Sequence, residues 1–347
     1  IALPFLVYAG FGRSWVRVLD YVLLYMILAI GLNIVVGQAG LLDLGYIAFY
    51  AVGAYLYALL ASPHFGLHLP FWVILPLGAA LAAFFGVLLG APTLRLRGDY
   101  LAIVTLGFGE IIRIFLNNLN APVNITNGPQ GVNMIDPATF GGFSFAGRYE
   151  VFGMTVTSAH LYYYLFLVLA LGAVFVSLRL QHSRIGRAWV AIREDEVAAE
   201  AMGINTTRIK LLAFAMGASF AGVAGVLFAS FQGFVSPESF NLLESIMVLC
   251  MVVLGGMGNI FGVMLGAFLL TVLPEALRYI GDAQRALLGE VVVDPGDLRM
   301  LLFGLALVAM MLYRPEGLLP SRRRAAELKP DPDVAAQEQA SLYDEQR

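Results

Sequence analysis

The sequence predicts an all-α integral membrane protein, a polytopic helical bundle of about nine to ten segments. Its 347 residues are 59% hydrophobic and only 13% charged, whereas soluble domains carry about 25% charged residues. The mean hydropathy is +0.79. Apolar stretches of about 20 residues, the length that a helix needs to cross a bilayer, recur along the chain. The apolar surface is therefore expected to face lipid.

The expected spans can be placed in chain order. They are residues 1–11, 19–36, 41–61, 70–91, 100–116, 161–180, 211–231, the stretch 242–274 and 299–313. As one helix, 242–274 would be about 50 Å long, which exceeds the roughly 30 Å hydrocarbon core. The sequence Gly-Gly-Met-Gly-Asn at 255–259 interrupts it. We therefore predict a broken helix pair near 242–274, two shorter helices that meet at this glycine turn.

Basic residues give the orientation. They gather at Arg95 and Arg97, within 179–210 and from Arg314 onward, and the positive-inside rule places such regions in the cytoplasm. These regions share one side of the membrane only if 242–274 crosses twice or re-enters, which agrees with a broken helix.

The domain organisation follows from this orientation. Residues 1–320 are predicted to form the membrane domain, with a cytoplasmic loop at 181–210 and an outer loop at 117–160. The charged, apolar-poor residues 321–347 are predicted to be a disordered cytoplasmic tail.

The chain lacks the motifs of several enzyme classes. It contains no GxxxxGK[ST], HExxH, GxSxG or CxxC motif, and its single cysteine, Cys250, cannot form an intrachain disulfide. The net charge of −3 argues against a nucleic-acid partner. We expect no enzymatic activity and no cofactor or metal in this chain.

Glu110 is the carboxylate expected near the middle of the membrane, about ten residues into its helix. Arg113, three residues later, is a candidate partner. The pair could fix helix packing, line a solute path or gate, or couple transport to protons.

The loop at 181–210 contains a candidate docking helix at 194–202. Its acidic residues 194–196 complement the helix dipole at its start, and Gly203 suits the position after its end. Such a helix can dock in a groove of a cytoplasmic partner or lie on the membrane surface. Four acids among seven residues fit anionic lipid poorly, which favours docking.

Four blocks of sequence resemble one known family. They are GQAGLLDLGYIAFYAVGAY at 37–55, DYLAIVTLGFGEIIRIFLNN at 99–118 with TNGPQGV at 126–132, GRAWVAIREDEVAAEAMGINTTRIKLLAFAMGASFAGVAGVL at 186–227, and ESIMVLCMVVLGGMGNIFGVMLGA at 244–267 with YRPEGLLP at 313–320. Together they resemble the LivM-type permease subunits of branched-chain amino acid ABC importers. The polar third block is the most specific, because apolar stretches match many membrane proteins by composition.

The resemblance implies a permease of the bacterial inner membrane that translocates leucine, isoleucine, valine or related small polar solutes by alternating access. It implies a second homologous permease, two cytoplasmic ATPase subunits that bind ATP and Mg²⁺, and an extracytoplasmic solute-binding protein. Asp43 and Tyr46 stand where many members of the family carry Ser and His, which leaves the solute open.

Two groups of residues are candidates for function. The predicted ATPase-coupling loop contains Arg187, Arg193, Glu194, Glu196, Ala198, Ala199 and Gly203. The predicted translocation path contains Gly37, Gln38, Gly40, Thr105, Gly107, Gly109, Glu110, Gly255, Gly256, Gly258 and Asn259. The ends of broken helices in these regions would offer N–H and C=O dipoles to a zwitterion. The alternative is a stand-alone secondary transporter or channel that uses Glu110.

Overall fold

A computed structural model of the chain describes residues 3–93, 99–120, 124–151, 154–288 and short stretches between 301 and 319. In chain order its elements are α1 (Leu3–Phe11), α2 (Arg13–Asn33), the π-helix η1 (Ile34–Gln38), α3 (Ile47–Leu60), α4 (Phe71–Thr93), α5 (Asp99–Asn118), the 3₁₀ helix η2 (Gly128–Gln130), β1 (Val132–Asn133), β2 (Thr139–Phe140), β3 (Phe143–Ser144), β4 (Tyr149–Val151), β5 (Met154–Val156), α6 (Ser158–Gln181), α7 (Arg184–Glu194), α8 (Glu196–Ala201), α9 (Thr206–Gln232), β6 (Phe234–Val235), the 3₁₀ helix η3 (Pro237–Ser239), α10 (Leu242–Gly255) and α11 (Ile260–Leu288). Seven described helices are long and apolar enough to cross a membrane, which confirms the predicted all-α polytopic class.

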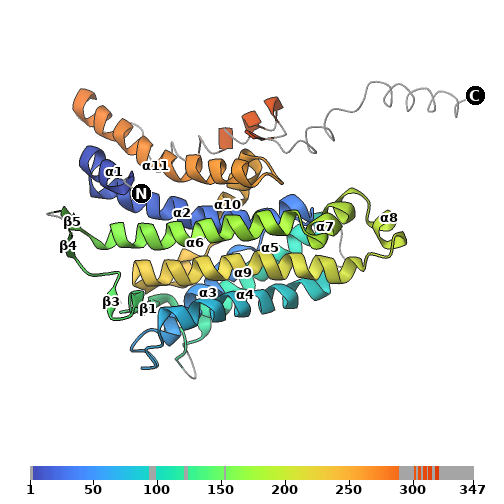
Figure 1. Ribbon diagram of the computed structural model, residues 1–347, viewed down its shortest axis with the longest axis horizontal. Coiled ribbons are helices and arrows are strands. Elements are labelled where there is room, and N and C mark those ends of the chain that lie inside the picture. The colour runs from blue at the N-terminus through green and yellow to red at the C-terminus, as the bar shows by residue number, and fades with distance from the viewer. Residues whose placement is uncertain are drawn as a thin grey trace, which may run out of the picture.

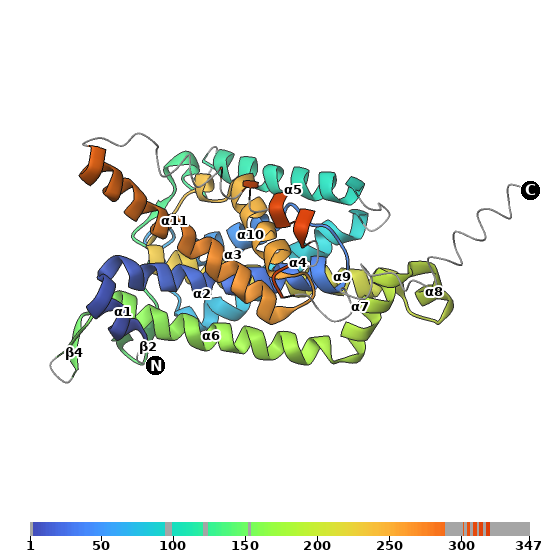
Figure 2. The ribbon, with the colours of Figure 1, turned by 90° about the horizontal axis from the view of Figure 1, so that it is seen from above.

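The long helices run side by side along the longest axis of the molecule. In Figure 1, α2, α4, α6 and α9 lie roughly parallel, with the short strands at one end and α7–α8 at the other. We call these the outer end and the inner end, following the predicted orientation of the basic loops. Seen from above, α5 and α6 lie at opposite edges of the bundle, with α2 and α10 between them (Figure 2).

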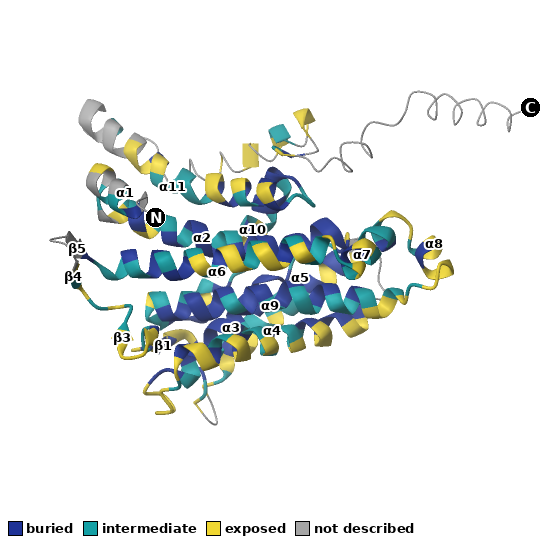
Figure 3. Cartoon of the chain, viewed as in Figure 1, coloured by how far each residue is buried: buried dark blue, intermediate teal, exposed yellow. Residues whose placement is uncertain are grey.

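Helix α9 forms the centre of one half of the bundle, and small residues allow its neighbours to approach closely. A Cβ atom added at Gly53 of α3 would overlap the carbonyl oxygen of Gly222, and one added at Gly222 would meet the carbonyl oxygen of Gly78 on α4 at 2.5 Å. Such contacts suit a membrane, where packing rather than hydrophobicity drives helix association. Buried residues gather on α2 and α9, while α4 and α6 expose their outward faces (Figure 3).

The predicted broken helix pair is confirmed. Helix α10 ends at Gly255 and α11 begins at Ile260. Gly256 and Gly258, with φ angles of +117° and +84°, take backbone conformations in the turn that favour glycine.

A second break was not expected. The predicted span 41–61 is helical only from Ile47, because residues 39–46 form a non-helical segment after the π-helix η1. Backbone bonds from Ala39 N–H to Ile34 O (3.1 Å) and from Leu41 N–H to Val35 O (3.0 Å) satisfy part of this segment inside the protein. Helix α3 is therefore a half-helix of 14 residues.

The outer loop is joined to the segment that precedes α10. Strand β1 pairs with β6 antiparallel, with Val132 opposite Val235, while β2–β3 and β4–β5 form hairpins within the loop. The predicted tail at 321–347, the residues Arg95 and Arg97, and about half of the predicted span 299–313 lie outside the described residues.

Candidate functional site

The two broken elements meet against α5. The backbone N–H of Leu44, which precedes α3, donates to Thr105 Oγ1 of α5 (3.0 Å). The carbonyl oxygen of Leu44 accepts from Ser245 Oγ, in the first turn of α10 (2.6 Å). Gly45 packs so closely on α5 that an added Cβ would overlap the Thr105 carbonyl oxygen. The N-terminal ends of two half-helices, each with a partial positive charge, therefore lie beside one another within the bundle.

Asp43 fixes the backbone of this junction. Its Oδ1 atom accepts from the Gly45 N–H (2.9 Å), and its side chain is fully buried. Tyr46, also fully buried, donates to the carbonyl oxygen of Gly217 on α9 (3.1 Å). These bonds satisfy much of the junction within the protein, as non-helical backbone at membrane depth requires, whereas Asp43 Oδ2 is buried with no hydrogen-bond partner among the described residues.

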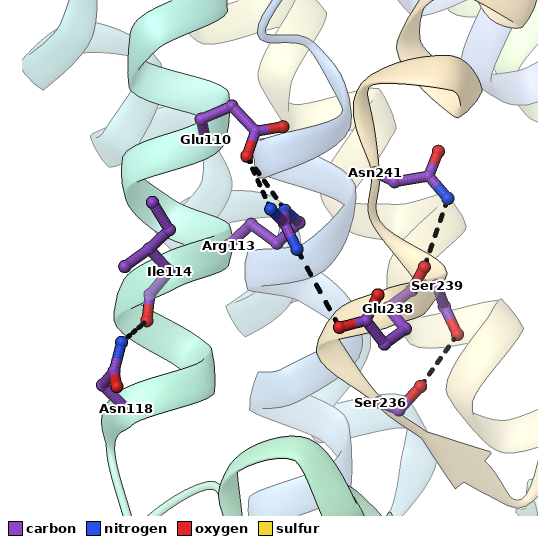
Figure 4. A network of polar contacts seen from close by, with 8 residues as sticks. All are labelled: Glu110, Arg113, Ile114, Asn118, Ser236, Glu238, Ser239 and Asn241. Atoms are coloured by element: carbon purple, nitrogen blue, oxygen red, sulfur yellow. Dashed lines mark hydrogen bonds and ion pairs between the residues drawn. The ribbon is translucent and has the colours of Figure 1, made fainter.

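A charged network lies next to the junction on α5. Arg113 Nη2 and Nε lie 2.9 and 3.0 Å from Glu110 Oε2, which confirms the predicted pair. Arg113 Nη1 also lies 3.9 Å from Glu238 Oε1 in η3. Asn241 donates to the Glu238 carbonyl oxygen (3.3 Å), so the same segment that carries Glu238 leads into α10 (Figure 4).

The face of α5 that carries this pair is open. Ile103, Ile111 and Ile114 are 64%, 64% and 52% exposed, and a Cβ added at Gly107 would meet nothing. The Glu110 and Arg113 side chains remain 33% and 27% exposed. Glu110 lies 11 residues from the start of α5, which is about 16 Å along its axis, near the middle of the membrane. Charges at this depth normally face protein or water rather than lipid.

A separate cluster at the inner end joins the loop 181–210 to η1. Arg193 of α7 donates from Nη1 to the Gly37 carbonyl oxygen (2.7 Å), and its aliphatic stem packs on Gly40. Gly258 N–H donates to Asn33 Oδ1 (2.8 Å), next to Gly37, which links the same point to the turn between α10 and α11.

The predicted docking helix at 194–202 is wrong in its bounds. Residues 184–194 form α7, and α8 covers only 196–201. The reason is Asp195, whose Oδ1 caps the second helix by accepting from the N–H groups of Val197 and Ala198 (2.8 and 3.0 Å). Glu194 therefore ends α7 instead of starting the docking helix. Gly203, with φ of +83°, follows α8 as predicted.

Helix α8 presents an apolar tip at the inner extremity of the molecule. Val197 and Met202 are 68% and 83% exposed, while Ala199 is buried. Lys210 of α9 holds the tip through Glu196 (2.6 Å between Nζ and Oε1). Figure 1 shows α8 projecting beyond the ends of the long helices.

The structure separates the predicted path residues into two places. Thr105 and Gly109 lie against Gly45, and Glu110 is paired with Arg113 beside them. The inner cluster holds Gly37, Gln38, Gly40, Gly255, Gly256, Gly258 and Asn259. Gly107 faces away from the protein, as described above.

Several residues that take part in the polar contacts of the junction, some through their backbone, were not among the predicted candidates. They are Asp43, Leu44, Gly45, Glu238 and Ser245. The closely spaced Gly37, Gly40 and Gly45 near an aspartate, Asp43, are the sequence signal that could have found the break at 39–46. Glu238 and Ser245 are brought to α5 only by the fold.

Comparisons with known proteins agree with this architecture. A family model described as the permease component of branched-chain amino acid transport systems matches residues 14–311. The high-affinity branched-chain amino acid transport system permease protein LivM of Escherichia coli is 46% identical over 95% of this chain and 74% of its own length. LivH of Salmonella typhimurium is 30% identical over 73% of this chain and 81% of its own. BraD of Pseudomonas aeruginosa is 29% identical over 85% and 91%. No solved structure matches the chain.

Proposed function

The chain belongs to the family of permease components of branched-chain amino acid transport systems, and from this premise we propose that it is a pore subunit of an ATP-binding-cassette importer. It moves leucine, isoleucine, valine or related small polar solutes by alternating access. The observation that carries the proposal is the polar junction of two half-helices beside the open face of α5.

The junction suits a zwitterionic solute. N-terminal ends of α3 and α10 favour a carboxylate, because their partial charges are positive. Glu110 and Glu238 offer negative charge to the ammonium group at the same face. The exposed isoleucines of α5 offer apolar contact to a branched side chain. These features support a path along this face of α5.

The open face of α5 also supports pairing with a second permease. An ion pair at mid-depth that is about one third exposed is costly against lipid, so the face is expected to be covered by a homologous subunit, with the solute path between the two. The pore would then form at the subunit boundary.

In this proposal, ATP hydrolysis by partner subunits at the inner end drives transport. Two ATPase subunits, which bind ATP and Mg²⁺, dock on α7–α8, where Val197 and Met202 provide an apolar contact. The chain itself carries out no catalysis. A solute-binding protein delivers the solute at the outer end, and the complex lies in a bacterial inner membrane.

The test is reconstitution. The chain, its partner permease, the two ATPases and the binding protein are placed in liposomes, and uptake of labelled leucine is measured with ATP on the ATPase side. We expect concentrative uptake that stops when the ATPases are omitted or replaced by a hydrolysis-deficient form. Saturable, concentrative uptake by this chain alone would refute the proposal and favour a stand-alone transporter that uses Glu110.

A further inference from the structure

A polar cavity of about 760 Å³ opens at the outer end, between α2, α6 and α11. None of its lining residues belongs to α3, α5 or α10, and α6, which contributes to the lining, lies at the opposite edge of the bundle from α5 (Figure 2). Its charged lining side chains are Arg17 of α2, Arg148 of the outer loop, and Glu275 and Arg278 of α11. Nothing in the transport mechanism proposed above uses these residues.

The cavity carries an excess of positive charge. Glu275 pairs with Arg278, whose Nη1 lies 3.1 and 3.0 Å from the two carboxylate oxygens. Arg17 lies over the ring of Phe231, 5.6 Å from its centroid, and Arg148 is exposed. Asp20 lies one turn along α2 from Arg17, but it is fully buried and does not line the cavity. The lining therefore has three cationic groups and one anionic group.

Two helices place the cavity at the same depth in the membrane. Arg17 is 21 residues from Gln38 at the inner end of η1, which corresponds to about 32 Å of helix. Arg278 is 18 residues from Ile260, the inner start of α11, which corresponds to about 27 Å. Because the hydrocarbon core is roughly 30 Å thick, both arginines lie where lipid headgroups begin.

An aromatic pair marks this depth independently. Trp15 Nε1 donates to the hydroxyl of Tyr279 (2.6 Å), and the two rings are stacked with their centroids 6.2 Å apart. Trp and Tyr are enriched at headgroup level, where one part of the ring is apolar and the other polar. The pair joins the same two helices, α2 and α11, that carry Arg17 and Arg278.

The first residues of α6 complete the lining. Thr157, Ser158 and Ala159 contact the cavity, so the positive end of a 24-residue helix adds to the arginines. Val18, Phe231 and Pro274 supply apolar walls. The surroundings therefore offer cations and hydroxyl groups to a headgroup and apolar surface to the start of an acyl chain.

We propose that this cavity binds the phosphate group of an anionic glycerophospholipid of the outer leaflet. Guanidinium groups bind phosphate oxygens through paired, charge-assisted hydrogen bonds, and three arginines from separate elements line this cavity. The net positive lining selects a headgroup with a net negative charge, such as phosphatidylglycerol, over the zwitterionic phosphatidylcholine. A bound lipid bridges α2, α6 and α11 at their outer ends.

The test is lipid binding to the purified full chain, measured by native mass spectrometry in a neutral detergent. Short-chain phosphatidylglycerol and phosphatidylcholine are titrated separately. We expect the wild type to bind phosphatidylglycerol about tenfold more tightly than phosphatidylcholine, and the double variant Arg17→Gln, Arg148→Gln to lose this preference. The control Arg208→Gln removes an exposed arginine at the inner start of α9 and should keep the preference.

A variant that is expected to bind more tightly keeps the proposal testable if the double variant misfolds. Glu275→Gln removes the acidic group of the lining, so phosphatidylglycerol binding should become about threefold tighter. Equal binding of the two lipids by the wild type, or an unchanged preference in the double variant, would overturn the proposal. A third arm titrates inorganic phosphate, and displacement of phosphatidylglycerol by phosphate at equal concentration would identify a site for a soluble anion instead of a lipid.

Discussion

Replacement of Arg193 by glutamine should uncouple ATP hydrolysis from solute uptake. Arg193 is a residue of α7 whose side chain reaches η1, through the 2.7 Å bond from Nη1 to the Gly37 carbonyl oxygen, and its stem packs on Gly40. In the proposed importer, a movement of α7–α8 that is driven by the ATPases passes to η1 through this contact. The change keeps most of the side-chain volume but removes the guanidinium group.

The size of the effect follows from the type of bond. A hydrogen bond that involves a charged group contributes about 1.5–3 kcal/mol, and this one is only partly shielded from water, so we take about 2 kcal/mol. If that contribution couples the docked loop to the membrane helices, its loss shifts the balance between inward-open and outward-open states by about 30-fold. The number of solute molecules taken up per ATP hydrolysed should fall by a similar factor.

The assay measures leucine uptake and phosphate release in the same proteoliposomes. We expect uptake to fall while ATP hydrolysis continues, and Arg193→Lys to restore part of the uptake because lysine can still donate one bond to the carbonyl oxygen. The control Arg179→Gln removes an arginine at the inner end of α6 that stacks on Phe175 of its own helix. A wild-type ratio of uptake to hydrolysis in Arg193→Gln would refute the reasoning.

Further substitutions test the junction and the loop. Gly45→Val places side-chain atoms against the backbone of α5 and should lower the free energy of unfolding in detergent by about 1–3 kcal/mol. Gly107→Val meets open space, so it should leave the free energy of unfolding unchanged. It should instead reduce pairing with the second permease, measured by co-purification. Glu110→Gln removes the carboxylate charge beside Arg113 and should lower the free energy of unfolding by about 1 kcal/mol. Uptake by this variant should still depend on ATP. If the wild type needs a proton gradient for uptake and this variant does not, Glu110 couples transport to protons. Gly203→Val places a β-branched residue at φ of +83° and should uncouple hydrolysis from uptake without preventing membrane insertion, as checked by fractionation; normal uptake would count against docking at α8.

The sequence predicted the break at 255–259 but not the one at 39–46, for a physical reason. Three glycines within four residues cannot continue a helix without cost, so the break at 255–259 is visible in the composition. At 41–61 the apolar run has the length of a complete span, and the break depends on tertiary contacts of Asp43 and Leu44 that no local pattern records. Length and hydropathy alone therefore gave a full span where the fold has a half-helix.

The candidate site was likewise predictable where its contacts are local in the sequence and not where they depend on the fold. Glu110 and Arg113 were predicted as a pair because they are three residues apart on one helix. Glu238 is 125 residues from Arg113 along the chain, and only the return of the chain after α9 brings it to within 3.9 Å. In the loop 181–210, the acids were assigned together to one helix, because sequence alone did not show that Asp195 would cap a second helix.

The two segments that lead into the half-helices α3 and α10 differ in a way that bears on how the pore opens. The first segment, 39–46, is held by buried groups, including Asp43 and Tyr46. The second segment, 233–241, has the Glu238 side chain 67% exposed and is joined to the outer loop by the two-residue strands β1 and β6. Opening the second segment exposes fewer buried polar groups, so it requires less free energy. Ser245 connects the segment 39–46 to α10, so displacement of η1 at the inner end would reach the segment 233–241 through this bond. That weaker segment is where we expect the path to open first.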